Sequence, residues 1–205
     1  MEAENILIKK AADDFISSNA LKYDILSSLF NLTNENYHEI IQQIKDHKDL
    51  FFKDHPSSIF FFYNIIQASK YNFKSLELLM DICVLFSTEI KSTSTTDAEL
   101  ITICYNYSNC LNYLFYKNFF TIESIVEKSF SNNEIFITFY PEIEAHDSEY
   151  AKIGEKKLFQ NNINDRLTEY FKFVKSNPKQ HILYRQLSYH PSPLHKSIRE
   201  DDIET

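Results

Sequence analysis

The sequence contains one glycine, Gly154, among its 205 residues. Loops that cradle phosphate groups and turns that bind dinucleotides need several glycines, because only glycine lets the backbone come so close to the ligand. The nucleophile elbow, Gly-x-Ser-x-Gly, needs two. The shortage of glycine therefore excludes three common kinds of catalytic or cofactor-binding loop. No other motif in the sequence specifies a reaction.

Long apolar runs are also missing. The densest one, Ile59–Ile66, is much shorter than the ~18–20 residues that span a membrane. The acidic start of the chain, Met1–Asn5, lacks the basic-then-apolar order of a signal peptide. The three cysteines, Cys83, Cys104 and Cys110, are an odd number in apolar helical contexts, and we expect reduced core thiols. These features predict an intracellular, cytoplasmic protein.

Basic residues are fewer than acidic ones, 21 against 29, and the formal net charge is −8. Nucleic acids and anionic membranes are bound by basic surfaces, so we expect neither as a partner. The composition is 43% hydrophobic and 15% aromatic, which is typical of a folded chain rather than a disordered one. The length allows one large or two small domains.

Apolar residues recur at helical spacing along nearly the whole chain, and this pattern predicts an all-α fold. A first helix is expected over residues 4–17, with a break at Ser18–Asn19. Residues 59–66 are apolar almost all round, which indicates a central helix. We read the Phe60–Tyr63 aromatic cluster as core rather than a ligand pocket. The helices should pair antiparallel in an irregular bundle or solenoid.

Helix starts are marked by short polar motifs. Asn36–Glu39, Thr96–Glu99 and Ser131–Glu134 resemble capping boxes, and Asp54-His55-Pro56 should end one helix and begin the next. The last capping box precedes Ile135–Tyr140, a run that could also be a strand. We predict a short buried helix there, because the cap is specific and no partner strand is visible.

Three regions follow from this pattern. Residues 1–141 are expected to form an N-terminal helical domain, in which 91–96 is the most loop-like stretch. Residues 142–189 should form a charged connector and helices, with a hinge or exposed segment over 142–157 around Gly154. Residues 190–205 should begin a further, truncated unit.

Metal or catalytic chemistry has little support in the residue spacing. His38 and His47 do not share a helix face, and His190 and His195 have no further cysteine or histidine nearby in sequence. The acidic residues of 142–149 lack the glycine and the ligand alternation of a calcium loop, so we expect a solvated segment. No cofactor and no metal site are predicted.

The C-terminal residues 190–205 carry the most specific pattern. Ser192 suits a helix N-cap, and Pro193 suits the first helical position, where its missing N–H costs nothing. Leu194 and Ile198 are four residues apart and share one helix face. Ile203 then begins a second helix.

This pattern resembles the opening of an ankyrin repeat, Thr-Pro-Leu-His-x-Ala followed by a glycine-containing turn and a second helix. It departs from the motif in having Ser192 for threonine, Ser197 for alanine and Asp201 for glycine. The match covers about half of a ~33-residue repeat. The resemblance implies a structural role for His195, whose side chain would hydrogen-bond the hydroxyl of Ser192. It also implies that further ankyrin repeats follow if the chain is a fragment.

A wider resemblance covers residues 131–205. Residues 131–136, 139–143 and 194–204 are similar to the region before and within the divergent ankyrin arrays of some protozoan proteins. Those proteins have a helical N-terminal region followed by ankyrin repeats. The resemblance implies protein binding, with a partner that the sequence does not identify.

We therefore expect a non-enzymatic interaction or scaffold module, the N-terminal helical region of an ankyrin-repeat protein. Two alternatives stay open: a free-standing helical domain that binds a small apolar ligand, and a hydrolase whose histidines and carboxylates meet only in the fold. A deep cleft with converging histidines and carboxylates would favour the enzyme, and a large apolar cavity the ligand binder. A filled core with an exposed apolar flank would favour the interaction module.

Overall fold

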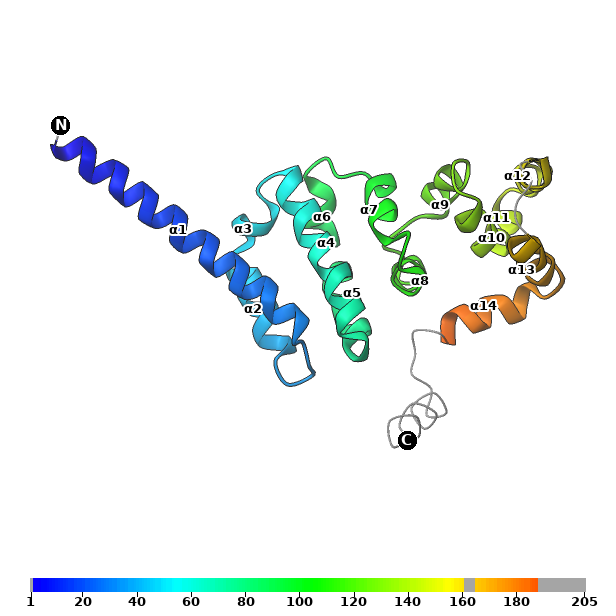
Figure 1. The fold of residues 1–205 in the computed structure, drawn as a ribbon, viewed down its shortest axis with the longest axis horizontal. Helices are drawn as coiled ribbons and strands as arrows, with labels where there is room; N and C mark the ends of the chain where they lie inside the picture. The colour runs from blue at the N-terminus through cyan, green and yellow to red at the C-terminus, as the bar shows by residue number, and fades with distance from the viewer. Residues whose placement is uncertain (1, 161–164, 188–205) are drawn as a thin grey trace. The chain divides into compact units, whose positions relative to one another are not determined.

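A computed structural model describes residues 2–160 and 165–187, and these residues contain only helices and no strand (Figure 1). The predicted all-α class is confirmed. The helices are α1 (Glu2–Phe30), α2 (Tyr37–Asp46), α3 (Lys48–Phe52), α4 (His55–Tyr71), the 3₁₀ helix η1 (Phe73–Ser75), α5 (Leu76–Leu85), α6 (Ser87–Ser92), α7 (Asp97–Cys104), α8 (Ser108–Tyr116), α9 (Ile122–Ser129), α10 (Asn133–Thr138), α11 (Tyr140–His146), α12 (Ser148–Gln160), α13 (Asp165–Ser176) and α14 (Pro178–Leu187).

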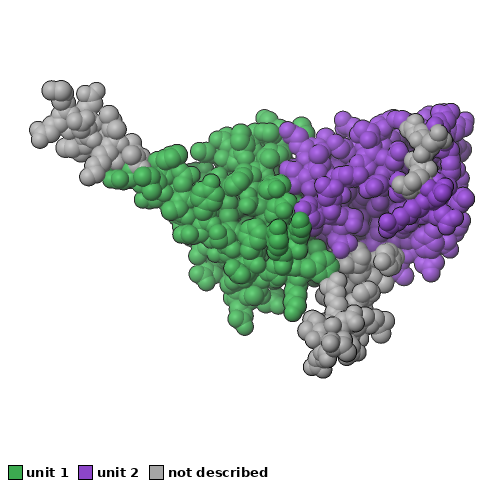
Figure 2. All heavy atoms as spheres, viewed as in Figure 1, with its two compact units in different colours: residues 1–96 green, residues 97–205 purple. Residues whose placement is uncertain are grey.

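The chain divides into two compact units, residues 1–96 and 97–205 (Figure 2). The division falls at the end of the predicted loop, between α6 and α7. The domain boundary expected after residue 141 instead lies inside α11. The short polar stretch at 91–96 was thus a better guide to the division than the change in charge after residue 141.

In the first unit, α4 is the central helix, as the sequence predicts. It packs against α1, α3, α5 and α6. Phe61 and Phe62 are fully buried, and the Phe61 ring lies 5.2 Å from that of Phe51 and 4.9 Å from that of Phe52. The core interpretation is confirmed for these two residues of the aromatic cluster. Phe60 and Tyr63 belong to the exposed side of α4.

The first helix is longer than predicted. α1 is a single helix of 29 residues that continues through Ser18–Asn19, so the expected break is wrong. The Asn19 amide donates to the carbonyl of Phe15 at 2.9 Å, one turn earlier, so this polar side chain stays within the helix. The N-terminal half of α1 extends beyond the other helices of this unit (Figure 1).

The predicted helix over Ile135–Tyr140 is confirmed as far as Thr138, where α10 (Asn133–Thr138) ends, and Tyr140 begins α11. Its N-cap is Asn132 rather than Ser131: the side-chain Oδ1 of Asn132 accepts the N–H of Ile135 at 3.0 Å. The helix start expected at Asp54-His55-Pro56 is also present, and the Ser57 N–H donates to the Asp54 carboxylate at 2.9 Å.

The capping box predicted at Asn36–Glu39 does not form. α2 does begin at Tyr37, but its N-cap residue makes no side-chain bond to the helix. The side-chain Oδ1 of Asn36 instead accepts the N–H of Thr33, at 2.7 Å. The Asn36 side chain therefore bonds to the loop before α2 and does not cap the helix.

The exposed connector expected over 142–157 is also wrong, because this segment is helical. α11 ends at His146, and α12 follows directly. Asp147 caps α12: its carboxylate accepts the N–H groups of Glu149 and Tyr150, at 3.0 and 2.8 Å. Tyr150 and Leu158 are buried, so the charged residues of α12 form the outer face of an amphipathic helix.

The three cysteines are buried and form no disulfide, as predicted. None of the described helices is long and apolar enough to cross a membrane.

Candidate functional site

Two features of the second unit stand out: a buried ion pair on α14 and a groove beside Gly154. The ion pair joins Arg185 of α14 to Glu142 of α11. Tyr116 of α8 completes the polar contacts, since its hydroxyl donates to Glu142 Oε1 at 2.7 Å and accepts from Arg185 Nη2 at 2.8 Å. The side chains of Arg185 and Glu142 are only 4% and 15% exposed.

Aromatic rings enclose the guanidinium. The Arg185 Cζ lies 4.6 Å from the ring centre of Phe139 and 5.6 Å from that of Tyr116. Cation–π contacts of this kind are worth about 2 kcal/mol when water is excluded. We call Arg185, Glu142, Tyr116 and Phe139 the Arg185 cluster. It holds α14 against α8 and α11.

His181 makes a second buried contact one turn earlier on α14. Its Nε2 donates to the carbonyl of Thr138 at 2.9 Å. Burial lowers the pKa of His181, and the positive charge of Arg185 adds to this, while the Thr138 bond and the Glu142 charge oppose it. His181 is thus held as the neutral imidazole. Its role is to fix α14, because the ring is almost completely buried.

The second feature is a groove of about 220 Å³ between α9, α10 and α12. The close packing at the base of the groove explains why residue 154 is a glycine, the only one in the sequence. A Cβ built on Gly154 would lie 2.4 Å from the ring of Phe136, so any larger residue would collide with that ring. The hinge expected at Gly154 is wrong, because this glycine lies within α12 and permits close packing. We call this site the Gly154 groove; it is lined by Ser129, Phe130, Asn133, Phe136, Tyr150, Ile153, Gly154 and Lys157.

Two large apolar side chains of the groove are open to solvent. Phe130 is 55% exposed and Ile153 is 57% exposed. The Phe130 ring lies 4.4 Å from that of Tyr150, which is buried. Such a surface suits an apolar side chain of a partner, because its binding would remove both rim residues from water.

Polar groups accompany this apolar surface. The hydroxyls of Ser129 and Tyr150 are hydrogen-bonded at 2.8 Å. Burial raises the pKa of Tyr150, so its hydroxyl stays protonated at neutral pH. Lys157 Nζ donates to the carbonyl of Phe130 at 2.8 Å and adds a positive charge. These groups give the groove a polar side as well as an apolar one.

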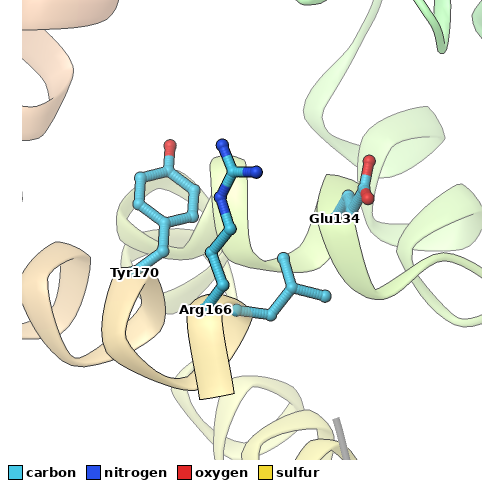
Figure 3. Close-up of a pocket in the computed structure, with 4 residues that line it drawn as sticks. Glu134, Arg166 and Tyr170 are labelled. Atoms are coloured by element: carbon cyan, nitrogen blue, oxygen red, sulfur yellow. The ribbon is translucent and has the colours of Figure 1, made fainter. Parts of the chain in front are cut away.

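A wider hollow of about 480 Å³ is lined by Glu134 of α10 and by Arg166, Leu167 and Tyr170 of α13. Figure 3 shows the Arg166 guanidinium between Tyr170 and Glu134. The Tyr105 hydroxyl donates to Glu134 Oε2 at 3.1 Å. Among the described residues that line this hollow and the Gly154 groove there is no histidine.

The ankyrin-like residues singled out in the sequence, 192–195, 198 and 203, lie outside the described residues, as do His190 and His195. Within the described part of the chain, no three histidine, cysteine or acidic residues are close enough to hold a metal ion. The acidic residues of 142–149 divide into two kinds. Glu142 is largely buried beside Arg185, so the prediction of a solvated segment is wrong for this residue. Glu144, Asp147 and Glu149 are exposed.

Sequence reasoning missed both features of the second unit. Arg185 follows His181 by four residues, so the two share one face of α14. That spacing was the available signal, but charged side chains rarely belong to a core. Gly154 was read as a chain-breaking residue, although the buried positions of α12 on both sides of it follow a helical pattern.

Searches of protein-family models, of curated proteins and of solved structures find no match to this chain.

Proposed function

We propose that this chain is a non-enzymatic protein-interaction module, the helical N-terminal region of an ankyrin-repeat protein, and that the Gly154 groove binds an apolar side chain of its partner. The groove carries the proposal. It combines a packed floor, exposed apolar residues at 130 and 153 and nearby polar groups. Binding sites on proteins commonly centre on a few such residues, which lose water when an anchor side chain enters.

The Arg185 cluster supports the scaffold part of the proposal. A buried ion pair costs free energy of desolvation, and in some proteins it is retained because it fixes one arrangement. Here it fixes α14, which ends at Leu187, shortly before the ankyrin-like residues 190–205. A rigid last helix would give the following repeat a defined starting direction. The buried, unlinked thiols support a location inside the cell.

The groove is tested by affinity capture from the native cell, comparing the wild-type chain with Ile153→Asp. Phe173→Asp is the matched control, since Phe173 is also an exposed apolar residue of this unit but does not line the groove. We expect proteins that wild type and Phe173→Asp retain and Ile153→Asp loses. Equal retention by all three chains would overturn the groove as the binding site. The absence of any enriched protein would overturn the interaction function.

The ankyrin part is tested separately by amide exchange over residues 190–205. The 205-residue chain is compared with one extended by complete ankyrin repeats. In repeat arrays each unit is stabilised mainly by its neighbours, so we expect protection to rise only in the extended chain. Protection already as strong as in residues 59–66 without extension would contradict the ankyrin interpretation.

A further inference from the structure

The Gly154 groove has an apolar part and a charged part, and both lie on one face of α12. Tyr150, Ile153, Gly154 and Lys157 follow one another at intervals of one to three residues that keep them on the same side of the helix. With a rise of about 1.5 Å per residue, this row extends for about 10 Å from position 150 to position 157. The groove therefore runs from an aromatic end at Tyr150 to a charged end at Lys157.

Lys157 is the only charged side chain among the described residues that line the groove. It is exposed, and its Nζ donates one hydrogen bond to the carbonyl of Phe130 at 2.8 Å. An ammonium group has three N–H donors, so two remain for another acceptor. Within residues 2–160 and 165–187, no carboxylate forms an ion pair with Lys157. Its positive charge is thus available to a partner.

The two acidic residues of α12 do not neutralise this charge. Glu155 forms an ion pair with Lys175 of α13, with 2.6 Å between Oε1 and Nζ, and its position is about 160° around the helix from that of Lys157. Glu149 is about 12 Å along the helix from Lys157 and does not line the groove. The groove therefore favours a negatively charged group, although the whole chain has a net charge of −8.

We propose that the partner of the Gly154 groove is an acidic protein segment, in which an aspartate or glutamate lies within about one helical turn of the apolar anchor side chain. This inference rests on the proposed function, because it names the chemistry of the partner at the same site. The anchor lies between the exposed side chains of Phe130 and Ile153, and the carboxylate accepts the remaining N–H groups of Lys157. Positions 153 and 157 are about 6 Å apart along α12, which sets the spacing of the two partner groups.

The size of the groove suits a side chain better than a small molecule. Its volume of about 220 Å³ is below the range of about 300–1,000 Å³ that is usual for small-molecule pockets. Lys157 then determines which anchor is accepted more than how tightly it binds. An exposed ion pair raises affinity by about fivefold at most, but a basic residue in the same place would meet a like charge. The bond to Phe130 already restrains the lysine, so pairing costs less conformational entropy.

Peptide selection tests which residues flank the anchor. Phage-displayed random dodecapeptides are selected on the wild-type chain, and the Kd of each enriched peptide is measured for wild type and for Ile153→Ser. This substitution removes apolar surface without adding charge. Peptides that lose at least about fivefold in affinity depend on the groove. We expect these peptides to carry aspartate or glutamate within about four positions of an apolar residue.

The selection separates this inference from the proposed function. Groove-dependent peptides with neutral or basic residues beside the anchor would overturn the acidic partner and leave the groove as a binding site. Peptides that bind wild type and Ile153→Ser equally, or a selection that enriches no peptide, would instead overturn the groove itself.

Charge exchange tests the contact with Lys157. Lys157→Glu should weaken the binding of a groove-dependent acidic peptide about tenfold, because it replaces an attraction by a repulsion. Replacing the acidic residue of the peptide by lysine should recover the affinity for this variant. Lys157→Arg keeps the charge and should bind within about twofold of wild type. Circular dichroism and urea unfolding verify that each variant is folded.

The matched control is Lys152→Glu, because Lys152 is an exposed lysine of the same helix that does not line the groove. It makes the same change in net charge, and we expect it to alter the Kd by less than about twofold. An unchanged Kd in Lys157→Glu, or equal losses in Lys157→Glu and Lys152→Glu, would overturn the proposed role of Lys157 and with it the acidic partner.

Discussion

Arg185 and Glu142 form an ion pair in the interior of the second unit, although they are 43 residues apart in the sequence. Glu142 Oε2 is buried and has no hydrogen-bond partner among the described residues. The carboxylate therefore depends on Arg185 and on the Tyr116 hydroxyl for compensation of its charge. Removing the arginine would leave a negative charge in a place that water hardly reaches.

We accordingly expect Arg185→Met to lower the unfolding free energy of the second unit by about 3–5 kcal/mol. Urea unfolding followed by amide exchange in α8 and α11 measures the loss. The double variant Glu142→Leu/Arg185→Met removes both charges and should recover most of it, because a buried ion pair can often be replaced by apolar residues. A loss below about 1 kcal/mol for the single variant would contradict a buried ion pair.

Gly154→Ala should destabilise the second unit. Alanine favours a helix by about 1 kcal/mol over glycine, but the added methyl group meets the Phe136 ring. That ring cannot move away freely, because it packs against Tyr140, Tyr150 and Phe171. Overpacking costs about 1–3 kcal/mol, so after the gain in helix propensity the net loss should be up to about 2 kcal/mol.

Thermal unfolding of the Gly154 variants measures this effect. Phe136→Leu should offset part of the loss when it is combined with Gly154→Ala, since leucine leaves room for the methyl group. Lys156→Ala, an exposed change on the same helix, is the control for α12. Stabilisation by Gly154→Ala would mean that the close approach of α12 to Phe136 is absent.

His181 should make stability depend on pH. Its pKa is lowered in the folded protein from its ordinary value of 6.5, mainly by burial. Between the two pKa values the unfolded chain binds more protons, so the unfolding free energy falls as the pH drops below about 6.5. We expect urea midpoints for the second unit to be lower at pH 5 than at pH 7.

His181→Gln should remove this dependence between pH 7 and pH 5, whereas the exposed His38→Gln should keep it. The carboxylate of Glu89, whose pKa is lowered chiefly by its hydrogen bond with Lys48, acts in a more acidic range, below its ordinary 4.5. The pH range in which His181 changes the unfolding free energy is therefore separate from the range in which Glu89 does. An unchanged pH dependence in His181→Gln would show that other groups cause it.

The cap of α10 gives a test of one residue against its neighbour. Asn132→Ala should cost about 1 kcal/mol, because the Ile135 N–H loses its acceptor. Asn132→Asp should keep most of the stability, since aspartate caps helices equally well. Ser131→Ala should cost less than about 0.5 kcal/mol, because Ser131 does not cap the helix. A larger loss of unfolding free energy in Ser131→Ala would instead support the capping box that the sequence suggested.

The helical class, the central position of α4 and the helix over 135–140 could all be predicted from apolar spacing and capping residues. These signals work because they are local: a cap or a stripe needs only residues within a turn or two. The wrong predictions were those in which polar or charged side chains were taken to interrupt a helix. Asn19 bonds back to the preceding turn, and the charged residues of 142–157 cover the outer face of helices.

The candidate sites were not predictable in the same way. Arg185, Glu142 and Tyr116 come from three helices, and nothing in their local sequence shows that they meet. The Gly154 groove depends on the contact between α12 and the Phe136 ring, which is again a tertiary relationship.

The separation of the Arg185 cluster along the chain also sets the order in which the second unit assembles. Tyr116 and Arg185 are 69 residues apart, whereas α11 and α12 are neighbours in sequence and pack directly. Local contacts form first, because closing a long loop costs more chain entropy. During synthesis, Tyr116 and Glu142 leave the ribosome before Arg185 does. A ribosome that pauses before residue 185 therefore holds a unit in which the core position of Arg185 is empty and the Glu142 carboxylate still faces water.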